Sequence, residues 1–201
     1  MTHTQRYAEA TFPERVWILG RPLQPSCCIG HALLLHRIGS PFVTGHGPEA
    51  ADEVGMGDLL LALYVCSRPW REAAVGIDKR RTRWLLKCWG WQLRRSNTDA
   101  AILRAELQLR DYITQAWDGP DFWEEQERKG ARRKSGAPVL ASLKAMLCGT
   151  FGYSEERALA TPIRVALFDT AAWAETQGAI QWVSDGDLAD IDEALRRVAT
   201  N

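Results

Sequence analysis

The sequence predicts an all-α protein, a compact bundle of about seven to nine short helices. Apolar residues recur at helical spacing in several segments, and glycine, proline, serine and threonine stand where such segments begin and end. Strand signals are weak, because no two alternating runs are joined by a tight Asn-Gly or Asp-Gly turn. The 201 residues are 46% hydrophobic and 25% charged, which is typical of a globular protein and excludes wholesale disorder.

The chain is expected to divide into an N-terminal arm and one helical domain. We expect residues 1–20 to form a loosely packed arm and residues 21–201 a single domain. Residues 1–26 are expected to be irregular, with prolines typical of extended backbone. Residues 43–57 are rich in glycine and indicate a long loop. Residues 128–136 contain five cations, two glycines and no large apolar side chain, so we expect a mobile basic loop there.

Helices are expected where apolar residues lie three and four positions apart. The segments with this spacing are residues 27–38, 59–67, 70–75, 78–95, 100–117, 139–147, 162–176 and 184–197. Short helical turns are expected at residues 121–127 and 155–159, with an extended link at 180–183. Most helical segments follow residues that favour a helix start, namely Ser26, Asp58, Pro69, Thr98, Ser154, Thr161-Pro162 and Ser184. Gly39 and Gly119-Pro120 are typical of helix ends.

Membrane and secreted classes are not expected. No apolar run reaches the roughly 18–20 residues that a membrane-spanning helix needs. Residues 1–9 are polar, with no apolar signal region after them. The five cysteines are scattered over separate apolar segments, which is not a disulfide framework. We therefore expect reduced thiols and a cytoplasmic protein.

No catalytic or metal-binding motif is found, so we expect a protein that is not an enzyme and holds no metal or cofactor. Cys27 and His31 would share a helix face, but the third and fourth ligands of a zinc site are missing. Every cysteine lies in a hydrophobic run, where a thiol is inert. Asp185-Gly186-Asp187 begins like a calcium loop, but Arg196 stands where the twelfth-position glutamate belongs.

The most distinctive region is basic and rich in tryptophan. Residues 68–95 carry nine cations and two acidic residues, whereas residues 151–201 carry four cations and nine acidic residues, net charges of +7 and −5. Trp70, Trp84, Trp89 and Trp91 are the candidate partner-binding residues in this region. A nucleic-acid surface is one interpretation, with tryptophans stacking on bases and cations binding phosphates. The candidate phosphate contacts are Lys79, Arg80, Arg81, Arg83, Arg94, Arg95, Arg132, Arg133 and Lys134.

A second interpretation places Trp84 and Trp89 in the core. The basic segment would then meet the acidic C-terminal helix, either within the chain or in a neighbouring subunit. Exposure of the tryptophans distinguishes the two interpretations, because only exposed rings can stack on bases.

Two stretches resemble small helical proteins of tailed-phage and prophage tail modules. The first contains Arg21-Pro22-Leu23, Ile29-Gly30-His31, Leu34, Gly39-Ser40-Pro41-Phe42, Asp58-Leu59-Leu60 and Cys66-Ser67. The second contains Pro162, Ala166-Leu167, Ala172-Trp173-Ala174-Glu175, Gly178 and Val183-Ser184-Asp185. The named group that these stretches resemble is the tail assembly chaperones.

The resemblance implies a non-enzymatic role in tail morphogenesis in the host cell cytoplasm. A tail assembly chaperone coats the long helical tape measure protein until the tail tube polymerises around it. The expected partner is therefore the tape measure or tail tube protein, bound through apolar grooves between short helices. A homo-oligomer and a nucleic-acid partner stay open as alternatives.

Overall fold

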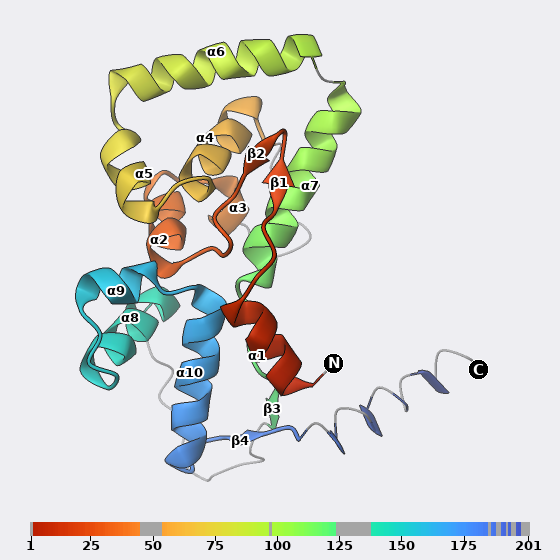
Figure 1. Cartoon of the computed structure of the whole chain (residues 1–201), viewed down its shortest axis with the longest axis vertical. Coiled ribbons are helices and arrows are strands. Elements are labelled where there is room, and N and C mark those ends of the chain that lie inside the picture. The colour runs from red at the N-terminus through yellow and green to blue at the C-terminus, as the bar shows by residue number, and fades with distance from the viewer. Residues whose placement is uncertain are drawn as a thin grey trace.

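The computed structural model describes residues 2–44, 54–96, 98–123 and 138–184, together with positions 186, 187, 190, 191, 193, 196 and 197. Within these residues the chain forms ten helices and two sheets of two short strands each. The expected all-α class is therefore confirmed. Figure 1 shows an elongated molecule in which one long helix crosses one end and the chain leaves at the other.

The centre of the molecule is a layer of short apolar helices. Helix α2 (Ile29–Arg37) contacts α3 (Pro41–Thr44), α4 (Met56–Cys66), α5 (Trp70–Gly76), α8 (Val139–Gly149) and α9 (Glu155–Ala160). Leu35 of α2 and Leu63 of α4 are fully buried. Such helices are too short to be stable alone, so their packing against each other holds them in place.

The other half is built on helix α10 (Ile163–Thr176), which packs against α8 and α1 (His3–Thr11) (Figure 1). Phe168 of α10 is 1% exposed, and the Tyr7 ring of α1 lies 5.6 Å from it. Arg6 of α1 donates hydrogen bonds to Asp118 and Asp121, beyond the end of α7 (Asp99–Gln115). These contacts attach the N-terminal helix to the body.

The expectation that residues 1–26 are irregular is wrong for α1. The helix begins at a capping box in which the Thr2 hydroxyl accepts from the Gln5 amide and the Gln5 side chain accepts from the Thr2 amide. Ala10 and His3 are buried against the body. Contacts through Arg6 and His3 hold this helix against the body. The helix therefore does not need the apolar stripe that would have indicated it in the sequence.

Two pairs of short strands also differ from expectation. Strands β1 (Trp17–Ile18) and β2 (Arg21–Pro22) form a hairpin whose turn holds Leu19 and Gly20 at positive φ, 49° and 72°, as a type I′ turn requires. Strand β3 (Phe122–Trp123) pairs with β4 (Gln181–Trp182). The helical turn expected at residues 121–127 is therefore wrong at the two residues of β3, whereas the link at 180–183 is extended as expected.

Three further expectations lie wholly or mostly outside the described residues. The first is the loop at 43–57, of which residues 45–53 are not described, while residues 43–44 end α3 and residues 56–57 begin α4. The expected basic loop at 128–136 lies outside the described residues. The last expected helix, at 184–197, is described only in part. The start of that helix is described. The Ser184 hydroxyl accepts from the Asp187 amide, and the Asp187 carboxylate accepts from the Ser184 amide, as expected for a helix N-terminus.

Candidate binding surface

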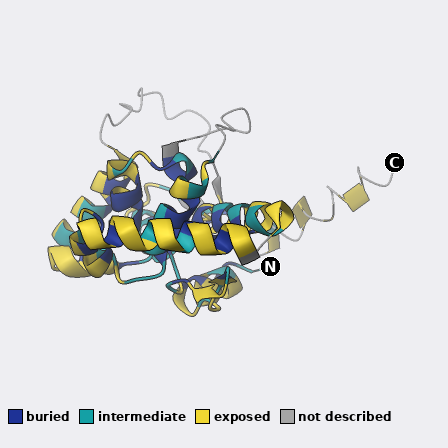
Figure 2. Cartoon of the chain, turned by 90° about the horizontal axis from the view of Figure 1, so that it is seen from above, coloured by how far each residue is buried: buried dark blue, intermediate teal, exposed yellow. Residues whose placement is uncertain are grey.

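Helix α6 (Arg80–Ser96) lies across one end of the molecule, over α4 (Figure 1). Its 17 residues span about 25 Å. One stripe of the helix packs against the body, with Thr82 and Leu93 buried and Leu86 and Trp89 half-buried. Figure 2, which views the molecule from the α6 end, shows the side of the helix that faces the viewer as mostly exposed.

The inward stripe holds α6 close to α4. A Cβ added at Gly90 would lie 3.0 Å from Leu60 Cδ1, so the absence of a side chain allows the close approach. Trp89 is covered on one face by Arg21 of β2, whose guanidinium carbon is 4.0 Å from the ring centroid. Trp89 is therefore a packing residue, as the core interpretation expects.

The outward face of α6 carries exposed aromatic side chains. Trp84 is 63% exposed, Trp91 is 64% exposed and Leu85 is 47% exposed. Trp84 and Trp91 are seven positions apart and therefore share a helix face, which we call the outer face together with Leu85. The interpretation of Trp84 as a core residue is wrong, because the buried stripe lies on the opposite side of the helix.

The remaining candidate, Trp70, belongs to a different place. It is half-buried at the start of α5 and packs over α2, where a Cβ on Gly30 would lie 2.6 Å from its ring. The structure therefore brings Trp84 and Trp91 together and separates Trp70 and Trp89 from them. The sequence could not distinguish these roles, since all four residues stand in the same basic segment.

The cations of this region are exposed and lie on α6 or just before it. They are Lys79, Arg80, Arg81, Arg83, Lys87, Arg94 and Arg95. Helix α6 contains no acidic residue, and the nearby Asp78 is bound to Arg37 at 2.5 Å. The end of the molecule that α6 forms is therefore strongly positive. Three of the candidate phosphate contacts, Arg132, Arg133 and Lys134, lie outside the described residues.

A groove of about 610 Å³ runs between α4 and α6, and we call it the α4–α6 groove. Leu60 and Leu61 of α4 and Leu86 of α6 contribute apolar surface to it. Cationic side chains line it from α6, namely Arg83, Lys87 and Arg94. Sequence reasoning missed this groove. The sequence feature that could have indicated the groove is that α4 is apolar on all sides. One face of such a helix packs in the core, and another apolar face is left to line a groove.

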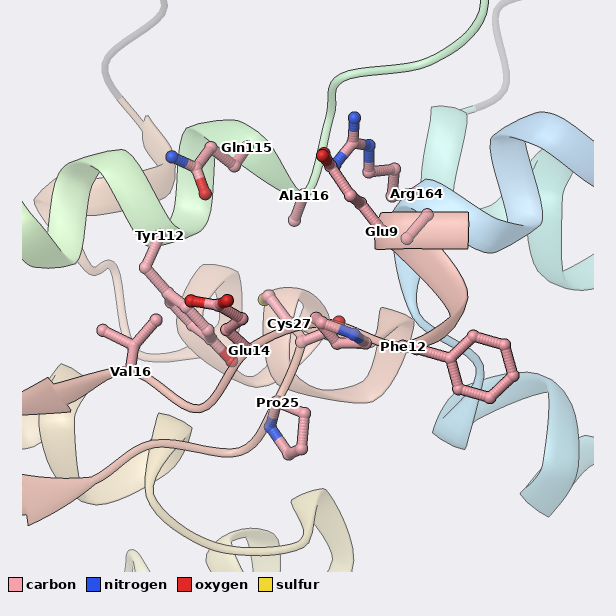
Figure 3. Close-up of a pocket in the computed structure, with 13 residues that line it drawn as sticks. Glu9, Phe12, Glu14, Val16, Pro25, Cys27, Tyr112, Gln115, Ala116 and Arg164 are labelled. Carbon is pink, nitrogen blue, oxygen red and sulfur yellow. The ribbon is translucent and has the colours of Figure 1, made fainter. Parts of the chain in front are cut away.

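A second cavity, of about 410 Å³, lies between α1, the end of α7 and the start of α10 (Figure 3). Tyr112 points into it, and its hydroxyl has no hydrogen-bond partner among the described residues. Burial holds the pKa of Tyr112 well above its usual range, so the phenol stays protonated at neutral pH. Arg164 at the other side is bound to Asp118 at 2.6 Å. The cavity is lined by apolar side chains together with the charged groups of Glu9, Glu14 and Arg164.

A cysteine–histidine pair is buried at the start of α2. Cys28 Sγ lies 3.2 Å from His31 Nδ1, and His31 Nε2 lies 2.7 Å from the carbonyl oxygen of Arg68. The residue beside His31 is thus Cys28 rather than the expected Cys27. Burial raises the pKa of the Cys28 thiol to about 12, so it is protonated at neutral pH and is not a nucleophile.

The described residues contain no cluster of three or more histidine, cysteine, aspartate or glutamate side chains that could hold a metal ion. Among the same residues, no helix has the length and apolar character needed to cross a membrane.

Fold and site together define a predominantly α-helical protein with a basic, tryptophan-bearing helix above an apolar groove. Comparisons with protein-family models, with curated proteins and with solved structures find no match to this chain.

Proposed function

We propose that this protein is a non-enzymatic assembly chaperone or adaptor that binds an amphipathic helix of a partner protein. The observation that carries the proposal is the α4–α6 groove, whose apolar floor is open and whose α6 wall is cationic. Helix-in-groove recognition uses this combination, since the apolar face of the guest is buried and flanking charges set its orientation. Trp91 at the rim is an aromatic anchor of the kind that dominates interface energies.

The proposed partner is a tail protein of a phage or prophage, with the tape measure protein first. The stretch that resembles tail assembly chaperones covers residues 21–67, and α4 within it forms one wall of the groove. A tape measure protein is long and helical, so it offers many amphipathic segments to many copies of a small chaperone. Each contact can be weak while the sum is strong, which allows polymerising tail tube to displace the chaperone in the host cytoplasm.

A nucleic-acid-binding role is the second candidate, and the exposure of Trp84 and Trp91 favours it. Exposed rings on a cationic helix can stack on bases while arginines bind phosphates. This role would use the outer face through Trp84, with Arg80 and Arg81, whereas the adaptor role uses the groove. Trp91 borders both surfaces and does not separate the two roles. The two roles therefore predict different sensitive residues.

Two matched leucine variants separate these roles in one pull-down. The tagged full chain is captured from its native host lysate with nuclease treatment and read by mass spectrometry. Leu61→Asp places a charge in the groove, and Leu85→Asp places the same charge on the outer face. We expect a long, helix-rich protein to be recovered by the wild type and by Leu85→Asp, and to be lost with Leu61→Asp.

The opposite pattern would support the second candidate. Partners that disappear on nuclease treatment, or binding lost on Arg80→Glu and Arg81→Glu but kept with Leu61→Asp, would contradict the adaptor role. Binding to nucleic acid would then fall steeply with salt, since each phosphate contact releases counterions.

A further inference from the structure

The C-terminal segment that begins at Ser184 has the pattern of an acidic amphipathic helix. It starts at the capping box between Ser184 and Asp187. Its acidic residues precede its first cation, Arg196, and are Asp185, Asp187, Asp190, Asp192 and Glu193. Leu188, Ile191 and Leu195 are three and four positions apart and so share one face. Ile191, the described member of this set, is 39% exposed.

The α4–α6 groove is complementary to this segment in charge and in length. Arg83, Lys87 and Arg94 fall on one side of α6 and line the groove beside its apolar floor, and the acidic residue in the lining, Asp78, is bound to Arg37. A helix over residues 184–197 would be about 21 Å long, close to the roughly 25 Å of α6. An apolar stripe flanked by carboxylates matches an apolar groove flanked by cations.

The segment starts at the opposite end of the molecule from the groove. Strand β4, which leads into Ser184, lies at the far end of α10, whereas α6 crosses the other end (Figure 1). The full length of α10, about 20 Å, and the layer of α2 and α4 separate the two. A helix of some 21 Å is too short to return along that path. The groove that it can reach therefore belongs to another copy.

We propose that the acidic C-terminal segment of one copy docks in the α4–α6 groove of a second copy. The two surfaces differ, so the contact is heterologous and each bound copy still offers a free groove and a free segment. Such contacts produce rings or open chains. The inference goes beyond the proposed partner, because it concerns the state of the protein without that partner, and self-association can fail while partner binding holds.

Sedimentation velocity of the full chain over a range of concentrations tests this proposal. The groove-reversed variant is Arg83→Glu with Lys87→Glu, and the segment-reversed variant is Asp190→Lys with Asp192→Lys. Like charges opposed across an interface cost several kcal/mol, so each variant should weaken self-association by about 100-fold or more. The matched control is Arg80→Glu with Arg81→Glu, which makes the same charge change on α6 outside the groove and should associate as the wild type does.

A mixture of the two reversed variants distinguishes direct pairing from loss of folding. The segment-reversed variant keeps a wild-type groove and the groove-reversed variant keeps a wild-type segment, while the lysines of the reversed segment face the glutamates of the reversed groove. Both kinds of contact are complementary, so the mixture should form larger assemblies than either variant forms alone. Wild-type assemblies should grow with concentration and shrink as salt is raised. A wild type that stays monomeric, a groove-reversed variant that assembles like the wild type, or a mixture that associates no more than either variant alone would overturn the proposal.

Discussion

The buried His31 makes the stability of this protein depend on pH between about 7.5 and 5.5. His31 is 2% exposed, and its Nε2–H donates to the Arg68 carbonyl oxygen at 2.7 Å. Its Nδ1 then carries the lone pair that accepts from the Cys28 amide and faces the Cys28 thiol. Protonation of Nδ1 would remove both interactions and would leave a positive charge buried. Burial accordingly lowers the pKa of His31 below its ordinary value of 6.5.

The sign and size of the effect follow from proton linkage. As the pH falls through 6.5, the unfolded chain takes up a proton at this histidine and the folded chain does not. Proton binding stabilises the unfolded state alone. The contribution of His31 to the free energy of unfolding is therefore fully present above pH 6.5 and decreases below it. The loss between pH 7.5 and pH 5.5 is at most about 1.4 kcal/mol, and it stops when the pH reaches the lowered pKa of the folded state.

Urea unfolding followed by circular dichroism at pH 7.5, 6.5 and 5.5 measures this loss. His31→Gln should be less stable at pH 7.5 by about 1–3 kcal/mol, because buried partners lose hydrogen bonds. The variant should also lose less stability on acidification than the wild type. His36→Gln, an exposed histidine in the same helix, controls for the loss of an imidazole. Equal acid sensitivity in the wild type and in His31→Gln would refute the assignment.

Three further substitutions test the packing. Tyr112→Phe removes a buried hydroxyl without a described partner and should raise the free energy of unfolding by about 1 kcal/mol in urea; a loss would show that the hydroxyl is bonded. Gly30→Ala puts a Cβ 2.6 Å from the Trp70 ring and should cost about 1–3 kcal/mol; an unchanged urea midpoint would contradict that packing. Arg6→Met breaks two ion pairs of a side chain that is 14% exposed and should cost about 2 kcal/mol. The exposed pair of Arg71 is the control, since Arg71→Met should cost under about 1 kcal/mol; equal losses in melting temperature would contradict the role of Arg6.

The helices that the sequence predicted well carry their own local signals. Thr98 caps α7 by accepting from the Ala101 amide, and Ser154 caps α9 in the same way. At α2 the predicted cap is shifted, because Cys28 rather than Ser26 precedes the helix. At α4 the N-cap is Gly55 and Asp58 lies in the first turn, which is one of the two places that the sequence allows for it. Local patterns therefore located these helices but placed some starts a few residues away.

Elements stabilised by distant residues were missed. Helix α1 depends on Arg6, which bonds to residues more than a hundred positions away. Strand β3 is two residues long and pairs with β4, which follows long after it in the sequence. Turn signals and short-range periodicity contain no information on such pairs, because register between distant strands is set by tertiary contacts.

The role of the tryptophans could not be predicted because α6 has aromatic residues on opposite faces. Trp89 and Trp91 are two positions apart, about 200° around a helix, so one packs inward when the other faces out. Only the position of α4 decides which of the two tryptophans packs inward. The groove was missed for a related reason, since Leu60 and Leu61 lie in a helix that is apolar on all sides after Asp58.

The central claim is that the α4–α6 groove holds a partner helix, and site-specific crosslinking tests it most directly. A photoreactive amino acid replaces Lys87 in the groove or Trp84 on the outer face of the full chain in its native host, and mass spectrometry reads the products. We predict crosslinks from position 87 to an amphipathic helical segment of a tail protein, and few from position 84. Crosslinks concentrated at position 84, or joined to nucleic acid, would contradict the account.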